Sequence, residues 1–98
     1  MEAPSVNAYM LTYVLELENG NYYVGRTMSL NVRLAYHWMG EGARWTKLYK
    51  PVKLLHVFVG DKEREKTLMM MRIHGWQNVR GSSWCRVDMK KPPSCLKC

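Results

Sequence analysis

The chain has 98 residues, of which 47% are hydrophobic and 23% are charged. This length allows one domain, and the composition is that of a globular protein rather than a disordered one. Fifteen Lys and Arg against eight Asp and Glu give a formal net charge of +7, which favours a polyanionic partner such as nucleic acid. No apolar run approaches the ~20 residues of a membrane-spanning helix, and no secretory signal precedes Asn7, so we expect no membrane association.

The first half of the chain predicts a hairpin followed by a helix. Residues 1–8 are interpreted as a lead-in, and residues 9–17 are rich in the β-branched and aromatic types that form strands. Asn19-Gly20 tolerates positive φ and predicts a tight turn, after which residues 22–25 return as the second strand. Ser29 is a candidate N-cap for a helix over residues 30–39, whose apolar side chains recur at helical spacing.

The second half predicts a further strand and a further helix. A basic and aromatic segment, residues 43–50, precedes a strand over 52–59. Asp61 can cap a helix over 62–74, which Gly75 ends, and one more short strand or a turn is expected around 78–81. The order β-β-α-β-α predicts an α+β domain over residues 9–89, with a small antiparallel β-sheet flanked by helices.

The cysteines give information about the cellular compartment and about a Zn²⁺ site. An odd number of cysteines without a signal peptide indicates a reducing, intracellular compartment, either cytoplasm or nucleus, with a viral origin also compatible. Residues 90–98 are interpreted as a basic Pro/Cys tail, in which Cys95 and Cys98 form a CxxC pair. The pair could begin a zinc knuckle that continues beyond this chain within a longer parent protein. It could instead join Cys85 and His74 or His56 in a complete Zn²⁺ site, or stay unliganded.

Four polar residues stand out by their spacing. Tyr13 and Tyr23 lie on the paired strands of the predicted hairpin, and both are expected to face the same side of the sheet. Arg33 and His37 are four residues apart, which places them on one face of the first helix. A guanidinium binds phosphate oxygens, and an imidazole or a phenol can transfer a proton, so together they would form a phosphate-handling surface.

These residues belong to an ordered set of motifs that resembles the GIY-YIG nuclease family. Leu11-Thr-Tyr13 stands where the family has its first tripeptide, and Tyr23-Val-Gly25 stands for the second. Arg33 and His37 follow at the family's separation. Three later segments also fit: Gly42-Ala-Arg-Trp-Thr46, Lys50-Pro-Val-Lys53 and the Gly-x-x-Asn-Val-Arg-Gly pattern of residues 75–81. The resemblance covers residues 9–84.

The resemblance implies a metal-dependent DNA endonuclease that hydrolyses phosphodiester bonds with one Mg²⁺ or Mn²⁺ ion. It gives Tyr13 or Tyr23 the task of orienting or deprotonating water. It gives Arg33 the task of stabilising phosphoryl charge, and His37 that of assisting proton transfer. Phosphate-backbone contacts are expected from basic side chains near the site: Arg26, Arg44, Lys47, Lys50 and Arg80.

One position departs from the family pattern. The family holds its metal with a glutamate in the later helix, and alignment on Thr67 and Gly75 puts that position near Met69. A thioether is a poor ligand for a hard cation. Glu65, one turn earlier on the same face, is the candidate replacement, whereas Glu63 is expected to point elsewhere. A shift in the alignment would also account for the mismatch. The alternative function is therefore a catalytically dead DNA- or RNA-binding module with the same fold, or a protein-interaction domain built around the zinc half-motif.

Overall fold

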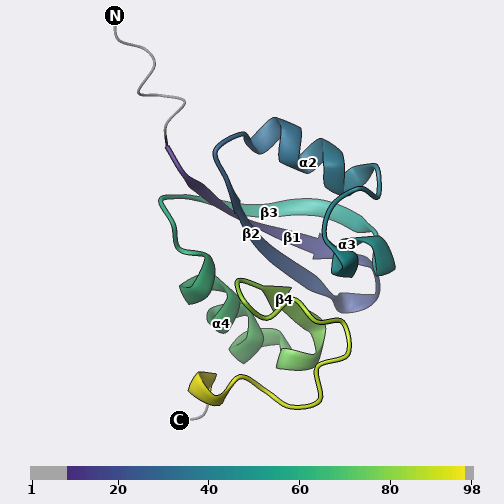
Figure 1. The fold of residues 1–98 in the computed structure, drawn as a ribbon, viewed down its shortest axis with the longest axis vertical. Coiled ribbons are helices and arrows are strands. Elements are labelled where there is room, and N and C mark those ends of the chain that lie inside the picture. The colour runs from purple at the N-terminus through teal and green to yellow at the C-terminus, as the bar shows by residue number, and fades with distance from the viewer. Residues whose placement is uncertain (1–8, 97–98) are drawn as a thin grey trace, which may run out of the picture.

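The computed structural model describes residues 9–96, which form a four-stranded mixed sheet with helices on both faces (Figure 1). The strands lie in the order β3-β1-β2-β4. Central β1 pairs antiparallel with both β2 and β3, whereas β4 pairs parallel with β2. The α+β class is confirmed, but the sheet is mixed rather than wholly antiparallel because the chain reaches β4 only after crossing under the sheet as a helix. The strand bounds are β1 (Leu11–Leu17), β2 (Tyr22–Thr27), β3 (Pro51–Val59) and β4 (Val79–Gly81).

The hairpin turn has the backbone that its sequence predicts. Asn19 and Gly20 both adopt positive φ, at 61° and 73°, and a short 3-10 turn spans Glu18–Gly20. Consecutive positive φ angles match the right-handed twist of the two strands, so β1 and β2 pair without interruption. The turn therefore fixes the register in which the two tyrosines face the same way.

The helices differ from the sequence-based expectation at one point. The structure has α2 (Leu30–Trp38), α3 (Arg44–Leu48) and α4 (Glu63–His74), and the short α3 was not expected. Five residues are too few for a periodic pattern to show. Ser29 stands at the start of α2, but its side chain makes no capping hydrogen bond. No helix within residues 9–96 is long and apolar enough to cross a membrane.

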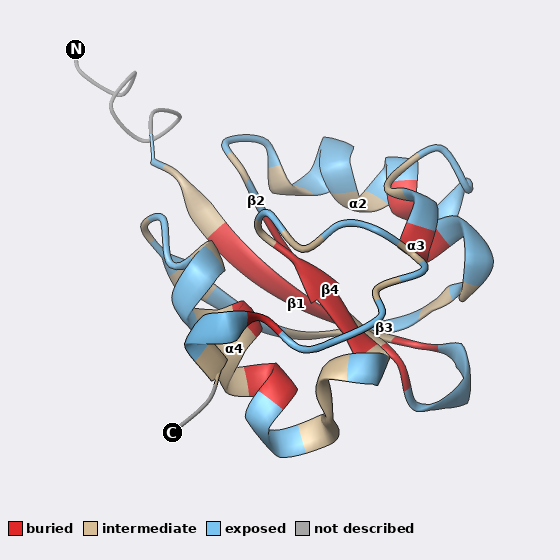
Figure 2. Ribbon diagram, turned by 60° about the horizontal axis from the view of Figure 1, so that its bottom comes forward, coloured by how far each residue is buried: buried red, intermediate tan, exposed pale blue. Residues whose placement is uncertain are grey.

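Alternate residues of the sheet build two separate cores. Val14 and Val24 point toward α4, where they pack with Met70, Met71 and Val79. The neighbouring positions point toward α2 and α3, where the buried cluster is Tyr13, Leu15, Leu17 and Trp45. Figure 2 shows the buried strands between the largely exposed outer surfaces of the helices. Because strand side chains alternate, this division places both tyrosines under α2 and α3.

The described part of the tail packs on the domain. Pro93 is buried, and Leu96 lies against the core cluster beneath α4. The chain beyond β4 therefore contributes to the packed structure up to residue 96.

Candidate active site

Two tyrosines lie next to each other on the face of the sheet that α2 and α3 cover. Tyr13 pairs with Gly25 across the hairpin, and Tyr23 pairs with Leu15, so the two phenol rings are diagonal neighbours with centroids 6.3 Å apart. A Cβ at Gly25 would collide with the Tyr13 hydroxyl and would crowd the Tyr23 ring. A glycine is therefore required at this position for both rings to fit, which explains its place directly after the second tyrosine.

His37 reaches down from α2 onto the same tyrosines. Its Nε2 lies 2.7 Å from the Tyr13 hydroxyl, and its Nδ1 lies 3.0 Å from the Thr46 hydroxyl. The Thr46 hydroxyl donates to the Ala43 carbonyl at 2.9 Å, so its oxygen can only accept from His37. Nδ1 therefore carries the proton, and the Tyr13 hydroxyl donates to Nε2. The result is a polarised chain that runs from Tyr13 through His37 to Thr46.

The chain of hydrogen bonds is buried, and burial sets its protonation. Only 1% of His37 is exposed, and burial together with the nearby charge of Arg33 lowers the pKa of His37 to about 4. Burial raises the pKa of Tyr13 well above its ordinary range and the pKa of Tyr23 to about 12, with a nearby negative charge at Glu63 adding to both. At neutral pH the imidazole and both phenols are therefore uncharged.

Arg33 supplies the positive charge at the mouth of this site. It lies one turn before His37 on α2, and its side chain is exposed. Its positive charge lowers the pKa of Tyr13 and of His37. The structure thus brings together the four residues that the sequence named as catalytic candidates: Tyr13, Tyr23, Arg33 and His37.

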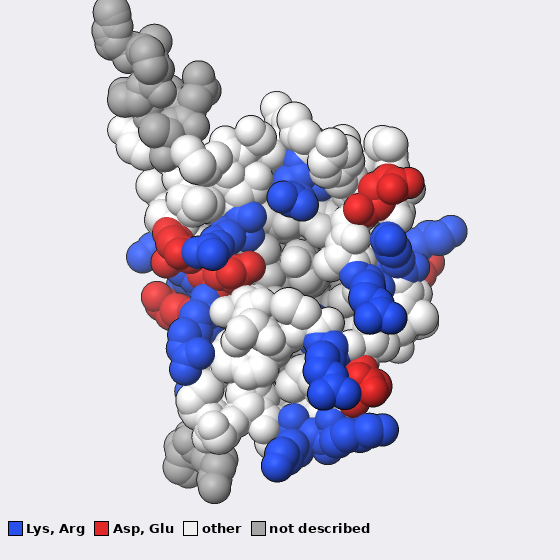
Figure 3. All heavy atoms as spheres, viewed as in Figure 1, with Lys and Arg blue, Asp and Glu red and all other residues white. Residues whose placement is uncertain are grey.

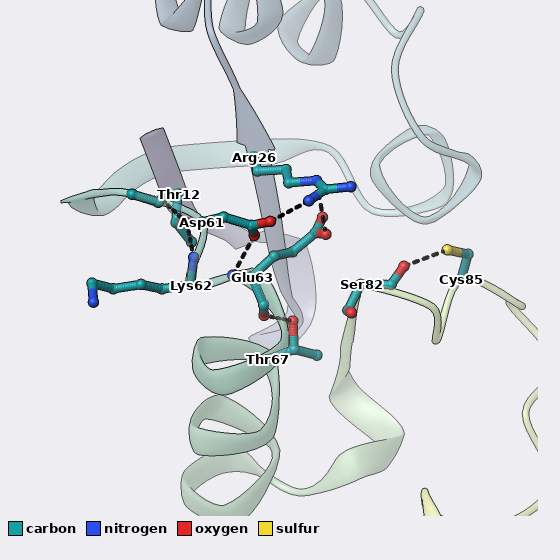
Figure 4. A network of polar contacts seen from close by, with 9 residues as sticks. Thr12, Arg26, Asp61, Lys62, Glu63, Thr67, Ser82 and Cys85 are labelled. Atoms are coloured by element: carbon teal, nitrogen blue, oxygen red, sulfur yellow. Dashed lines mark hydrogen bonds and ion pairs between the residues drawn. The ribbon is translucent and has the colours of Figure 1, made fainter. Parts of the chain in front are cut away.

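Glu63 is a carboxylate that the sequence analysis rejected. It lies in the first turn of α4, only 17% of its side chain is exposed, and its Oε1 is 3.5 Å from Nε of Arg26. Figure 4 shows Arg26 between this carboxylate and that of Asp61, with which Arg26 forms a second ion pair. Burial raises the pKa of Glu63, while Arg26 and a backbone hydrogen bond from Ser82 oppose the shift. Glu63 is thus the α4 carboxylate that acts on the tyrosines.

Glu65 and Met69 lie elsewhere on α4. The Glu65 side chain is 68% exposed and pairs with Lys66 at 3.6 Å, and Met69 is half-buried against the core beneath α4. The charge that acts on the tyrosines comes from Glu63, which the sequence analysis expected to point elsewhere, and the role of Glu65 as metal ligand stays a prediction. The helical stripe that faces inward begins at Glu63 and continues through Thr67, Met70 and Met71, and this 4-3-1 spacing is the signal that could have identified it.

The predicted DNA-contacting residues divide into two groups. Arg44, Lys47 and Lys50 are exposed on and after α3, and Figure 3 shows basic side chains on that side of the molecule. Arg26 is half-exposed but is paired with acidic groups.

Arg80 does not belong to this surface, because it is 3% exposed. Its guanidinium donates to five backbone carbonyls and stacks 4.3 Å from the ring of buried Trp45. Arg80 therefore organises loops in the interior, and its predicted contact with DNA was wrong.

The candidate zinc ligands do not converge within the described chain. Cys95 is exposed and accepts a hydrogen bond from Arg64, while Cys98 lies outside the described residues. His74 stacks on Tyr22 and His56 contacts Phe58. Residues 9–96 contain no group of three or more His, Cys, Asp or Glu side chains that could hold a metal ion.

A single carboxylate nevertheless fits one divalent ion. Mg²⁺ is commonly held by one or two carboxylates together with the phosphate oxygens of its substrate. Glu63 offers hard oxygen donors, is close enough to raise the pKa of both tyrosines and is mostly screened from solvent. Met69 offers only a thioether, so the donor chemistry favours Glu63.

The fold and the cluster of two tyrosines, a histidine and an arginine over one face of the sheet define an α+β domain with a candidate phosphate-handling site. The GIY-YIG catalytic domain model matches residues 9–71, and the chain therefore belongs to this family. It is 49% identical over 49 residues to a UPF0213 protein of Streptococcus pneumoniae, a match that covers 50% of this chain and 48% of that protein. It is 38% identical over 61 residues to a UPF0213 protein of Halobacterium salinarum, covering 62% and 79% of the two chains.

The chain spans about half the length of the first of these curated relatives. A UPF0213 protein of Pediococcus acidilactici is 43% identical over 58 residues, which are 57% of this chain and 58% of that one. No solved structure matches the chain.

Proposed function

We propose that this chain is a DNA endonuclease domain that hydrolyses phosphodiester bonds with one divalent metal ion. The observation that carries the proposal is the buried hydrogen bond from Tyr13 to His37, together with the positive charge of Arg33 and the negative charge of Glu63, both of which act on Tyr13. Hydrolysis of a phosphodiester requires a proton acceptor for water and positive charge for the phosphoryl oxygens. This cluster provides both.

The hydrogen-bond polarity gives a route for the proton. The Tyr13 hydroxyl donates to His37, so its oxygen can accept a hydrogen bond from an attacking water, which substrate binding would have to admit to this buried position. As water loses a proton to Tyr13, Tyr13 can pass its own proton to Nε2 of His37. A phosphate anion bound nearby would favour this transfer, because a negative charge raises the basicity of the imidazole. Tyr23 would orient the water.

Arg33 and Glu63 would handle charge at the phosphate. The exposed Arg33 guanidinium can donate two parallel hydrogen bonds to phosphoryl oxygens. Glu63 would hold the divalent ion, once Arg26 releases the carboxylate that it now pairs with. When bound, such an ion would supply further stabilisation of the charge that develops on the phosphate.

The first test compares two glutamates in the same helical turn. Purified chain is mixed with supercoiled plasmid and with a branched oligonucleotide, in Mg²⁺, in Mn²⁺ and in chelator. We expect nicking that depends on the metal, a loss of at least ~100-fold in Glu63→Gln and in Arg33→Ala, and little change in Glu65→Gln. Glu65→Gln is the matched control, because its carboxylate is exposed and paired only with Lys66.

Two results would contradict the proposal. Full activity in Glu63→Gln would remove Glu63 from the metal site, and full activity in Arg33→Ala would remove the role of Arg33. A clear gel shift without any product under all metal conditions would support the second candidate, a module of the same fold that binds DNA or RNA without cutting it. The observation that favours this candidate is the pairing of Glu63 with Arg26, which keeps the carboxylate occupied by a cation of the protein itself.

A further inference from the structure

A hollow of about 320 Å³ adjoins the active site between the end of α2 and α3. Its wall includes His37 and Thr46, which are two members of the buried hydrogen-bond chain. The rest of its lining comes from residues that the catalytic cluster does not use, among them Trp38, Lys47 and Lys50. The hollow therefore borders the active site at these two residues.

The chemistry of this lining combines a flat aromatic ring with two cations. Trp38 is 47% exposed even though it directly follows the buried His37. Lys47 and Lys50 are both exposed, and Lys47 also borders a neighbouring hollow that contains Arg44. Aromatic rings stack on bases, and lysines attract the phosphates that flank them, so this pairing is typical of sites for single-stranded nucleic acid.

A fully paired duplex could contact the two lysines of this lining but could not stack a base on Trp38. Lysines alone suffice to contact the phosphates of a duplex, whereas an indole ring can stack on a base only when that base has left its pair. The other aromatic residue of the basic segment, Trp45, is 4% exposed and donates to the Tyr22 carbonyl, so it is not available for stacking. Trp38 is therefore the aromatic platform on this side of the site.

We propose that the hollow binds an unpaired nucleotide of the DNA strand that is cut, with its base stacked on Trp38 and its phosphates near Lys47 and Lys50. This inference rests on the proposed function, and it names the substrate class: DNA that carries a single-stranded or branched segment next to the scissile phosphate.

The test measures binding in chelator, where no cleavage is needed. Two labelled DNAs are compared by fluorescence anisotropy at fixed salt: a blunt duplex, and the same duplex with a short single-stranded flap. We expect the wild-type chain to bind the flap DNA about 10-fold more tightly, because one stacked base contributes this order of affinity. Trp38→Ala should abolish the preference, and Trp38→Phe should retain most of it. Lys47→Ala and Lys50→Ala should weaken binding of both DNAs.

Tyr36→Ala is the matched control, since Tyr36 is an equally exposed aromatic on the same helix and lies outside the hollow. It should leave the preference intact. An unchanged preference in Trp38→Ala, or none in the wild-type chain, would overturn the proposal. A preserved flap preference in a chain that never cuts DNA would instead contradict the proposed function and leave the binding site standing. Circular dichroism of each variant verifies folding.

Discussion

His37 couples the protonation of the site to the stability of the fold. Its pKa is about 4 in the folded chain and about 6.5 when unfolded. Between these values the unfolded chain binds more protons, so the contribution of His37 to stability is complete above pH 6.5 and is lost as the pH falls toward 4. We expect this loss to reach about 3 kcal/mol at most. Denaturant unfolding at pH 7 and at pH 4.5 measures it.

The control for this titration is His37→Gln, which cannot be protonated. Its free energy of unfolding should depend less on pH over the same window, because the remaining acid-sensitive groups are unchanged. Equal pH dependence in the two proteins would mean that His37 does not remain neutral in the folded state. Thermal melts at the same two pH values give an independent reading.

The burial of Arg80 could not be predicted from the sequence. An arginine in a basic chain is ordinarily solvated, and the Gly-x-x-Asn-Val-Arg-Gly pattern that contains Arg80 does not indicate that its side chain is buried. The structure buries Arg80 because the carbonyls of the Trp76–Asn78 turn, of Val79 and of the loop at Arg86 and Val87 surround its guanidinium. These acceptors are backbone atoms brought together by tertiary folding, and a sequence does not display them.

By contrast, Tyr13, Tyr23 and His37 were found from their spacing, since hairpin register and helix period fix which face they occupy.

At the scale of elements, α4 decides which carboxylate faces the site. Two stripes run along this helix, and the inward one begins at Glu63 and continues through Thr67 and Met70. The other stripe contains Glu65, Met69 and Ile73, of which Glu65 and Ile73 are exposed. A helix of twelve residues with methionine at three consecutive positions has a weak apolar contrast, so the sequence alone favoured the wrong stripe.

This assignment predicts the outcome of restoring the family's glutamate. We expect Glu63→Gln combined with Met69→Glu to stay inactive, because Met69 belongs to the stripe that contains exposed Glu65. Metal affinity, measured by calorimetry with Mn²⁺, should also remain as low as in Glu63→Gln alone. Met69 contacts the core beneath α4, so a charge there should cost about 1–2 kcal/mol of stability, visible in the melting temperature.

Rescue of cleavage by Met69→Glu would contradict this reading of the helix. The single variant, with Glu63 intact, is the companion measurement. If it binds the metal more tightly than the wild-type chain, then both stripes reach the site, and the family position remains functional in this fold.

Among the other elements, some follow from the local sequence and others depend on tertiary contacts. The Asn19-Gly20 turn and the bounds of α2 and β3 followed from local chemistry, because turn residues and helical spacing act within a few positions. The short α3 and the parallel pairing of β4 did not. The five residues of α3 are too few to show a period, and β4 lies parallel to β2 only because α4 returns the chain beside that strand.

At the scale of the whole molecule, charge is divided along the chain. Residues 1–20 hold three acidic residues and no basic one, while residues 21–98 hold all fifteen lysines and arginines with five acidic residues. The sheet separates α2 and α3 on one face from α4 on the other, so the exposed cations of α3 lie on the same face as the tyrosines. We therefore expect a phosphate backbone that approaches the site to meet Arg44, Lys47 and Lys50.

This arrangement predicts how DNA affinity depends on salt. Each phosphate contact contributes about 0.9 to the slope of log affinity against log salt concentration for duplex DNA. We expect the double variant Lys47→Ala, Lys50→Ala to reduce that slope by roughly 2. Arg72→Ala, which removes an exposed charge from α4 on the opposite face of the sheet, should leave it nearly unchanged. Anisotropy titrations of a blunt duplex between 50 and 200 mM salt, roughly the range over which such slopes are resolved, measure the effect. Equal losses in the two proteins would show that attraction is spread over the whole surface rather than concentrated beside the active site.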